Sequence, residues 1–320
     1  MSEKSNPHTA LLNALGPLAA LYSDPAVLEI MVDSPERVLV ERSGKLEEAG
    51  IKFDSEASLH DLIDAVLAQG SLKLEVGQTI FDSRFVDGSR VLAVFPPTAP
   101  KGPTLVIRKL IPPAITWDAL FRFGSVTQEA YDLLQEAIRE HKNILVAGGT
   151  GSGKTTVLRL LAESIPADER LVIAESSHEL QIHHPRAVFL EAGGPAKISL
   201  PDLISTAAKM RPDWLVIGEL LGEEAMRAVE VMGRGHCGMT TIHATSPEDA
   251  LSRLEAMCLM SNLGLGLGEI RNLIASALQV IISQQKFPDG RRRITHYVEL
   301  RGIENDRYML QPLYRYQKVE

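Results

Sequence analysis

Eight residues near the middle of the chain have the types and spacing of a phosphate-binding loop. The pattern GxxxxGK[ST] is matched in full by Gly148, Gly149, Thr150, Gly151, Ser152, Gly153, Lys154 and Thr155, and Thr156 follows. Glycines let backbone N–H groups turn toward phosphate oxygens at a helix N-terminus, whose partial positive charge favours an anion. The spacing therefore predicts an ATP site, in which Lys154 binds the β- and γ-phosphates and Thr155 places its hydroxyl on Mg²⁺.

Two acidic residues end apolar runs elsewhere in the same half of the chain. Glu219 follows WLVIG and Glu175 follows RLVIA. The carboxyl ends of parallel strands are where α/β sheets bind ligands. We therefore expect Glu219 to be the Walker B residue beside the metal, and Glu175 to position or activate the attacking water. A solvated charge at a strand end is the alternative for each.

His236 and His243 flank a short apolar segment, in GRGHCGMTTIHA. Neither has a third ligand at a spacing typical of a metal site. From their spacing alone, both histidines are expected to be structural.

The elements that must position these residues change character along the chain. From Gln128 onward, helical patterns alternate with the short apolar runs NILVAGG, RLVIAES, WLVIGEL and MTTIHA. Continuous apolar runs are typical of parallel strands covered by helices on both faces. This half is predicted to be a doubly wound α/β domain spanning 128–320. Residues 277–314 resemble antiparallel strands that either finish the sheet or form an appendage.

The first hundred residues favour a smaller α+β domain over 1–111, joined by a linker at 112–127. Strands are expected at 38–42 and 104–110, with a helix from Ser58. FDSRFVDGSRVLAVF predicts a hairpin whose turn is Asp87-Gly88. Prolines up to Pro113 mark the boundary.

Composition limits the classes of protein to which the chain can belong. A net charge of -8 and 5% aromatic residues argue against strong binding to nucleic acid, which uses basic grooves and stacking rings. The N-terminus lacks the basic and apolar segments of a signal peptide, and no apolar run reaches the ~20 residues of a membrane span. We expect a cytoplasmic protein with at most a peripheral membrane contact.

Three of these motifs occur together, and in the same order, in the secretion ATPases. GGTGSGKTT, RPDWLVIGEL and GHCGMTTIHA resemble the branch that contains the CpaF-type ATPases of tight-adherence pili and the TrbB-type ATPases of conjugation. The N-terminal segments DPAVLEIMVDSPERVLVERSGKLE and GPTLVIRK resemble the CpaF branch in particular. The resemblance covers nearly the whole chain, from about Leu15.

The resemblance implies a RecA-like P-loop ATPase domain in a homo-hexamer, working on inner-membrane secretion or pilus platform proteins. It makes Glu175, with Glu179 beside it, the general-base candidate, and it implies that His236 and His243 contact the γ-phosphate. It also implies phosphate-facing arginines in the N-terminal domain, at Arg84, Arg90 and Arg108.

Two positions depart from the family pattern. Ser176 stands where the family usually has Asp, and Leu221 where it usually has Arg. We expect these positions to be neighbours at the ends of adjacent strands. The two departures suggest one alternative to a transport motor, a nucleotide-gated structural ring with low turnover. A RecA-type nucleic-acid motor is a second alternative, because that core also uses a P-loop sheet.

Overall fold

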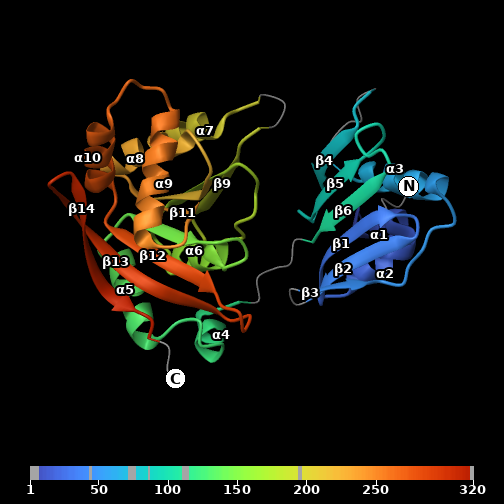
Figure 1. Ribbon diagram of the computed structural model, residues 1–320, viewed down its shortest axis with the longest axis horizontal. Coiled ribbons are helices and arrows are strands. Elements are labelled where there is room, and N and C mark those ends of the chain that lie inside the picture. The colour runs from blue at the N-terminus through green and yellow to red at the C-terminus, as the bar shows by residue number, and fades with distance from the viewer. Residues whose placement is uncertain are drawn as a thin grey trace. The chain divides into compact units, whose positions relative to one another are not determined.

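The chain divides into two compact units, residues 1–112 and 113–320 (Figure 1). The computed structural model describes residues 7–42, 45–70, 77–85, 87–109, 115–193 and 197–317. Each unit has its own sheet and its own buried core. The fold is therefore two domains, and each can be described by itself.

The first unit is a six-stranded antiparallel sheet in the order β3-β2-β1-β6-β5-β4. Its strands are β1 (Val27–Ser34), β2 (Arg37–Arg42), β3 (Lys45–Glu48), β4 (Ile80–Arg84), β5 (Arg90–Val94) and β6 (Thr104–Arg108). The helices are α1 (Pro7–Leu15), the short 3₁₀ helix Gly16–Leu18, α2 (Ala19–Ser23) and α3 (Glu56–Leu67).

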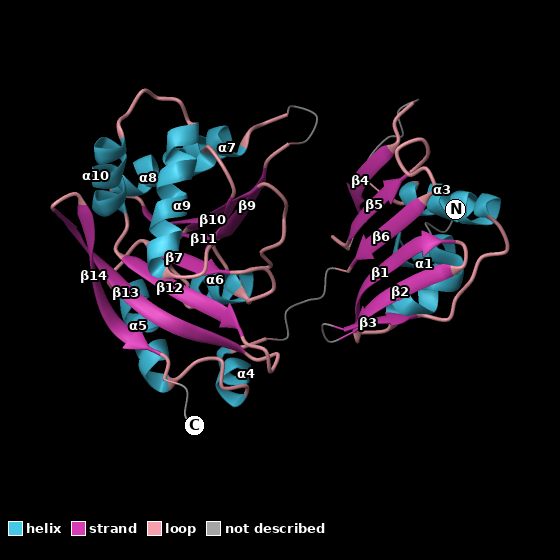
Figure 2. Ribbon diagram, viewed as in Figure 1, coloured by secondary structure: helices cyan, strands magenta, loops and turns pink. Residues whose placement is uncertain are grey.

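Alternation along the strands decides which face of this sheet the helices cover. Val91 of β5 and Ile107 of β6 are buried with Leu15 of α1 and Ile63 of α3. Their neighbours along the strands point to the other face, where exposed and half-buried residues lie. One face of the sheet thus carries the core of the unit (Figure 2).

The second unit is an eight-stranded sheet in the order β14-β13-β12-β7-β11-β10-β8-β9. Its strands are β7 (Ile144–Gly148), β8 (Leu171–Glu175), β9 (Ala187–Glu191), β10 (Trp214–Leu220), β11 (Cys237–His243), β12 (Val280–Lys286), β13 (Arg292–Glu304) and β14 (Arg307–Arg315). The strands from β12 to β9 pair in parallel, and β13 and β14 pair antiparallel.

Helices cover both faces of this second sheet (Figure 2). They are α4 (Trp117–Arg122), α5 (Gln128–Arg139), α6 (Lys154–Glu163), α7 (Leu200–Ala208), α8 (Glu224–Gly233), α9 (Pro247–Met260) and α10 (Leu267–Ala277). Along β7, Ile144 and Val146 pack with α4 to α6, while Leu145 and Ala147 pack with α7 to α10. Burial on both faces explains why the strands are continuous apolar runs.

Side-chain caps fix where several of these helices begin. Thr127, Ser199 and Ser246 each accept a hydrogen bond from a backbone N–H in the first turn of α5, α7 and α9. Such caps satisfy donors that a helix N-terminus leaves without an intrahelical partner. Ser55 caps α3 in the same way, so this helix begins before the predicted Ser58.

The predicted fold class is confirmed. The predicted linker needs a correction, and the place of the C-terminal strands is decided. The segment 112–127 is not simply a linker, because α4 lies within it and Leu120 and Val126 belong to the core of the second unit. The strands β12 to β14 finish the sheet, and β12 pairs in parallel with β7. No helix in the described part of the chain is long and apolar enough to cross a membrane.

Candidate nucleotide-binding site

The predicted phosphate-binding loop connects the buried strand β7 to helix α6, as the motif requires. Gly148 ends the strand where space is smallest: a Cβ there would lie 2.4 Å from the Ser152 Oγ and 2.5 Å from the Gln284 carbonyl oxygen. Gly151 and Gly153 have φ angles of 67° and 97°, the left-handed region that glycine alone adopts without strain. Three of the motif's glycines are therefore required by the backbone of the loop itself.

Lys154 is the first residue of α6, and its side chain turns back over the loop. Its Nζ lies 3.3 Å from the Gly149 carbonyl oxygen and 3.2 Å from the Glu219 Oε1. The Lys154 side chain is only 9% exposed, against 39% for Glu219. A largely desolvated ammonium is thus held at a helix N-terminus by a carbonyl and a more accessible carboxylate.

The pairing of strand β10 is interrupted around Gly218, just before Glu219. The pairing of β10 with β11 is irregular between Val216 and Glu219, and Glu219 lies opposite Thr241. The hydroxyls of Thr240 and Thr241 donate to the Gly218 carbonyl at 3.2 and 3.3 Å. These two bonds hold the irregular segment that precedes Glu219, whose carboxylate contacts Lys154.

Glu175 ends β8 and is 3% exposed. Its Oε1 accepts hydrogen bonds from the backbone N–H groups of Glu179 at 3.1 Å and Leu180 at 2.9 Å, and its Oε2 lies 3.3 Å from the His178 Nδ1. Burial raises the pKa of Glu175 above its ordinary value, although the two N–H groups act in the opposite direction. A buried carboxylate with a raised pKa is suited to exchanging a proton with water.

Gly218 also makes room for this carboxylate. A Cβ on Gly218 would lie 3.3 Å from the Glu175 Cγ, tighter than most side-chain contacts. The sheet order separates β8 from the loop strand β7 by β10 and β11, which is about 14 Å across the sheet at the usual strand spacing. Glu179, by contrast, is exposed and contributes its backbone to the site.

The two histidines lie at opposite ends of β11. His243 ends the strand, directly opposite Gly148, and is half-buried beside the loop. His236 precedes the strand and lines a polar pocket of about 470 Å³ that also contains His141 and Asp213. Six residues lie between the two, and seven steps along an extended strand correspond to about 23 Å. Within one copy of this unit, the structure does not bring His236 to the phosphate-binding loop.

The three arginines form a row on the first unit. Arg84 lies opposite Arg90 in the β4–β5 pair, and Arg90 lies opposite Arg108 in the β5–β6 pair. Directly opposed residues share a face of the sheet, and here it is the face that the helices leave uncovered. Arg90 also binds Asp82 through two hydrogen bonds of 2.9 and 2.5 Å, and this contact lowers the pKa of Asp82.

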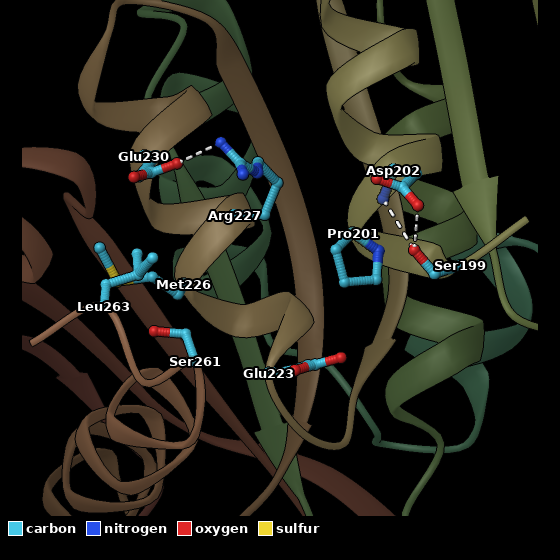
Figure 3. Close-up of a pocket in the computed structure, with 9 residues that line it drawn as sticks. All are labelled: Ser199, Pro201, Asp202, Glu223, Met226, Arg227, Glu230, Ser261 and Leu263. Atoms are coloured by element: carbon cyan, nitrogen blue, oxygen red, sulfur yellow. Dashed lines mark hydrogen bonds and ion pairs between the residues drawn. The ribbon is translucent and has the colours of Figure 1, made fainter.

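A separate hollow of about 270 Å³ lies between α7, α8 and the connection from α9 to α10 (Figure 3). Asp202, Glu223, Glu230, Arg227 and Leu263 are among its lining residues. The Arg227 Nη1 lies 2.6 Å from the Glu230 Oε2, and Figure 3 marks this pair with a dashed line. None of the predicted site residues lines the hollow, so it is distinct from the phosphate-binding loop.

The residues around the loop fit a bound nucleotide with its metal ion. The Ser152 hydroxyl is buried without a hydrogen-bond partner among the described residues, and the Thr155 side chain is exposed at the start of α6. No group of three or more His, Cys, Asp or Glu in the described part of the chain could hold a metal by itself. A Mg²⁺ ion would therefore need phosphate oxygens in addition to Thr155 and Glu219.

Sequence reasoning missed the residues that support this site from neighbouring strands. Gly218, Thr240, Gln284 and Arg292 come close to the loop or its carboxylates only through strand pairing. Only the two glutamines that follow the apolar run of β12 could have indicated one of these residues from the sequence. They identify a strand with a polar end, but they do not indicate that this end lies beside the phosphate-binding loop.

Ser176 and Leu221 were expected to be neighbours at the ends of adjacent strands, and the structure agrees only in part. Strands β8 and β10 are neighbours, but Ile217 lies opposite Ala174. Counted from that pair, Ser176 is level with Glu219 and two positions short of Leu221. Both side chains are exposed, that of Leu221 by 63%.

Known proteins resemble this chain over most of its length. The model of the type II/IV secretion system protein family matches residues 12–294. A putative conjugal transfer protein of Mycobacterium tuberculosis is 30% identical over 305 residues, covering 92% of this chain and 86% of the relative. The conjugal transfer protein TrbB of Rhizobium radiobacter is 28% identical and covers 91% and 89%.

Among solved structures, the pilus retraction motor PilT with bound ADP superposes with a TM-score of 0.64. The identity is 19%, and the match covers 90% of this chain and 83% of PilT, so this likeness concerns the fold. The family match and the conjugal transfer relatives confirm the resemblance to secretion ATPases. The chain belongs to the type II/IV secretion system protein family.

Proposed function

We propose that the chain binds Mg-ATP at the loop between β7 and α6 and hydrolyses it to ADP and phosphate. The observation that carries this proposal is Lys154, whose ammonium is largely buried between the Gly149 carbonyl and the Glu219 carboxylate. A desolvated cation at a helix N-terminus attracts a polyanion. This loop pattern binds the phosphates of nucleoside triphosphates, and solved structures with a similar fold include an ATPase and a motor with bound ADP, which favours ATP.

Each remaining residue has a proposed role. Backbone N–H groups of the loop from Gly148 to Thr156 hold the phosphates, while Thr155 and Glu219 hold the metal ion. Glu175 takes a proton from the attacking water, directly or through a second water, and His243 faces the γ-phosphate.

The arginine row of the first unit has a proposed role in the same reaction. Arg84, Arg90 and Arg108 would neutralise phosphate charge when the first unit closes over the nucleotide. His236 is left outside this set by its position at the other end of β11.

The proposed biological role is that of a homo-hexameric motor in secretion, conjugation or pilus assembly. The conjugal transfer relatives support it. The motor would lie at the cytoplasmic side of the inner membrane and act on platform proteins there. A ring with low turnover is the second candidate, because Ser176 and Leu221 depart from the family pattern.

Phosphate release from Mg-ATP by the purified chain tests this proposal. Lys154→Ala should reduce turnover to background, whereas Lys209→Ala, an exposed lysine after α7, should retain the wild-type rate. Turnover near zero in a wild-type chain that still binds ATP would favour the low-turnover ring. Stimulation by single-stranded DNA would favour a nucleic-acid motor, and sedimentation with ATP would measure the oligomer.

A further inference from the structure

Arg292 reaches the phosphate-binding loop from a part of the chain far from it in sequence. Its Nε donates a hydrogen bond of 2.7 Å to the carbonyl oxygen of Gly151. Its aliphatic stem passes beside Gly153, where a Cβ would lie 3.4 Å from the Arg292 Cδ. The guanidinium is thus on the outside of the loop, at the two glycines with left-handed backbone.

The hairpin that carries Arg292 is firmly held. Arg292 is the first residue of β13, after a turn in which the Phe287 N–H donates to Arg291 O at 2.8 Å. The next residue, Arg293, is 8% exposed, and its guanidinium lies 4.9 Å from the Phe287 ring centroid and 5.2 Å from that of Tyr316. These contacts anchor the base from which Arg292 projects.

The bond to Gly151 acts on one peptide unit of the loop. In a trans peptide, the carbonyl of Gly151 and the N–H of Ser152 point in opposite directions. The Ser152 N–H donates to Gly149 O at 3.2 Å, inside the loop, while the Gly151 carbonyl faces Arg292 outside it. The peptide is therefore held from both sides.

Glycine makes such an outside support necessary. Gly151 populates left- and right-handed backbone with similar ease, so the loop can turn this peptide over at little cost. Turning it over would break the bond from the Ser152 N–H to Gly149 O and would direct the Gly151 carbonyl into the loop, where it would repel phosphate. A donor fixed on the outside opposes that rotation.

We propose that Arg292 is a positioning residue for the nucleotide: through its Nε, it holds the Gly151–Ser152 peptide with its carbonyl turned away from the phosphates. This inference rests on the proposed ATP site and adds a residue from the β12–β13 hairpin to it. It also makes the last antiparallel strands part of the binding machinery, in addition to finishing the sheet.

The test uses two substitutions that keep the side chain out to the position of Nε and remove the atoms beyond it. Arg292→Gln places an amide nitrogen at the same position along the side chain as Nε, so it keeps the donor and loses the charge. Arg292→Met keeps the stem and loses both. Arg291→Ala is the matched control, because Arg291 belongs to the same turn and lies 4.0 Å from Asp289, away from the loop.

Titration calorimetry with ADP and ATP measures the affinities, and steady-state kinetics separates KM from kcat. Arg292→Met should weaken both nucleotides about tenfold, the loss expected for one charge-assisted hydrogen bond. Arg292→Gln should stay within about threefold of the wild type. In both variants kcat should change less than twofold, because the bond acts on binding rather than on the reacting atoms.

Two results would overturn the inference. If Arg292→Met binds ADP as the wild type does, the bond does not position the loop. If Arg292→Gln is as weak as Arg292→Met while Arg292→Lys binds normally, the charge of the side chain acts on the phosphates directly. A wild-type chain that binds no ATP or ADP would instead refute the proposed function itself.

Discussion

Replacing Gly148 by Ala tests whether the loop is as tightly packed as its geometry indicates. The added methyl group would lie 2.4 Å from the Ser152 Oγ, 2.5 Å from the Gln284 carbonyl oxygen and 2.9 Å from the Lys154 Cγ. Ordinary contacts of this kind are 3.4–4 Å. The strand end or the loop must therefore move by about an ångström, because the Gln284 carbonyl belongs to the paired backbone of β12 and cannot rotate away.

The structure also provides the control for this substitution. A Cβ on Gly149 would meet no heavy atom of the described residues within 4 Å, and the φ angle of Gly149 is not in the left-handed region. Gly149→Ala adds the same methyl group, one residue further along the chain, at no steric cost. Any difference in stability between the two variants then reports the packing around Gly148.

Overpacking of this kind costs about 1–3 kcal/mol of unfolding free energy, and the backbone contact places Gly148→Ala near the upper end. For a domain of about 200 residues, that corresponds to a fall in Tm of roughly 5–10 °C. Gly148→Ala should also weaken ADP binding more than tenfold, because Ser152 and Lys154 are displaced together. Thermal melting and calorimetry measure both effects. Equal melting temperatures for Gly148→Ala and Gly149→Ala would refute the packing argument.

Three further predictions concern the carboxylate and histidine residues at this end of the sheet. Glu175→Gln should bind ATP but turn it over at least a hundredfold more slowly, since an amide cannot take a proton. The turnover rate of Glu179→Gln should stay within about threefold of the wild type. If a phosphate-release assay finds the reverse order, the general base is Glu179. Because the pKa of Glu175 is raised in the folded state, its contribution to stability is complete below its ordinary value of 4.5 and is lost as the pH rises through the folded pKa. Chemical denaturation at several pH values should therefore find Glu175→Gln more stable than the wild type at pH 7, by a margin that shrinks toward pH 4.5; a margin independent of pH would contradict this. His243→Ala should reduce turnover about tenfold, and His236→Ala should reduce it less than twofold. Equal losses in the two variants would mean that the distance between the two histidines along β11 does not separate their roles.

The strand, loop and helix around the phosphate-binding motif could be predicted because the pattern is local. The glycines, Lys154 and Thr155 lie within eight consecutive positions, and in this motif the backbone of one loop supplies most of the phosphate contacts. The roles of Glu175 and Glu219 rest on the same kind of reasoning, because a carboxylate at the end of an apolar run lies at the carboxyl edge of a parallel sheet. Here the structure places Glu219 against Lys154, and Glu175 three strands from the loop strand.

The groups of residues that strand pairing brings together could not be predicted from the sequence. The arginine row depends on register, since Arg84, Arg90 and Arg108 meet only when three strands are aligned. His236 shows the opposite case: it stands near His243 in sequence, but the apolar residues between them form a strand that separates them. The helix α4 was missed because six residues are too few to display a helical period.

If the loop binds ATP as proposed, the ion pair between Lys154 and Glu219 would connect nucleotide binding with the position of the proposed metal ligand. A phosphate group at the loop and the Glu219 carboxylate are both anions, so they compete for the one ammonium of Lys154. Glu219 is the more exposed partner, and its end of β10 is fixed by the threonine bonds to Gly218, so the carboxylate can leave Lys154 without moving the strand. When phosphates take Lys154, the carboxylate loses its cation beside a newly arrived polyanion, and a divalent ion is then the species that relieves the repulsion. In the proposed ATP site, the pair would therefore favour the binding of nucleotide together with its metal ion over the binding of nucleotide alone.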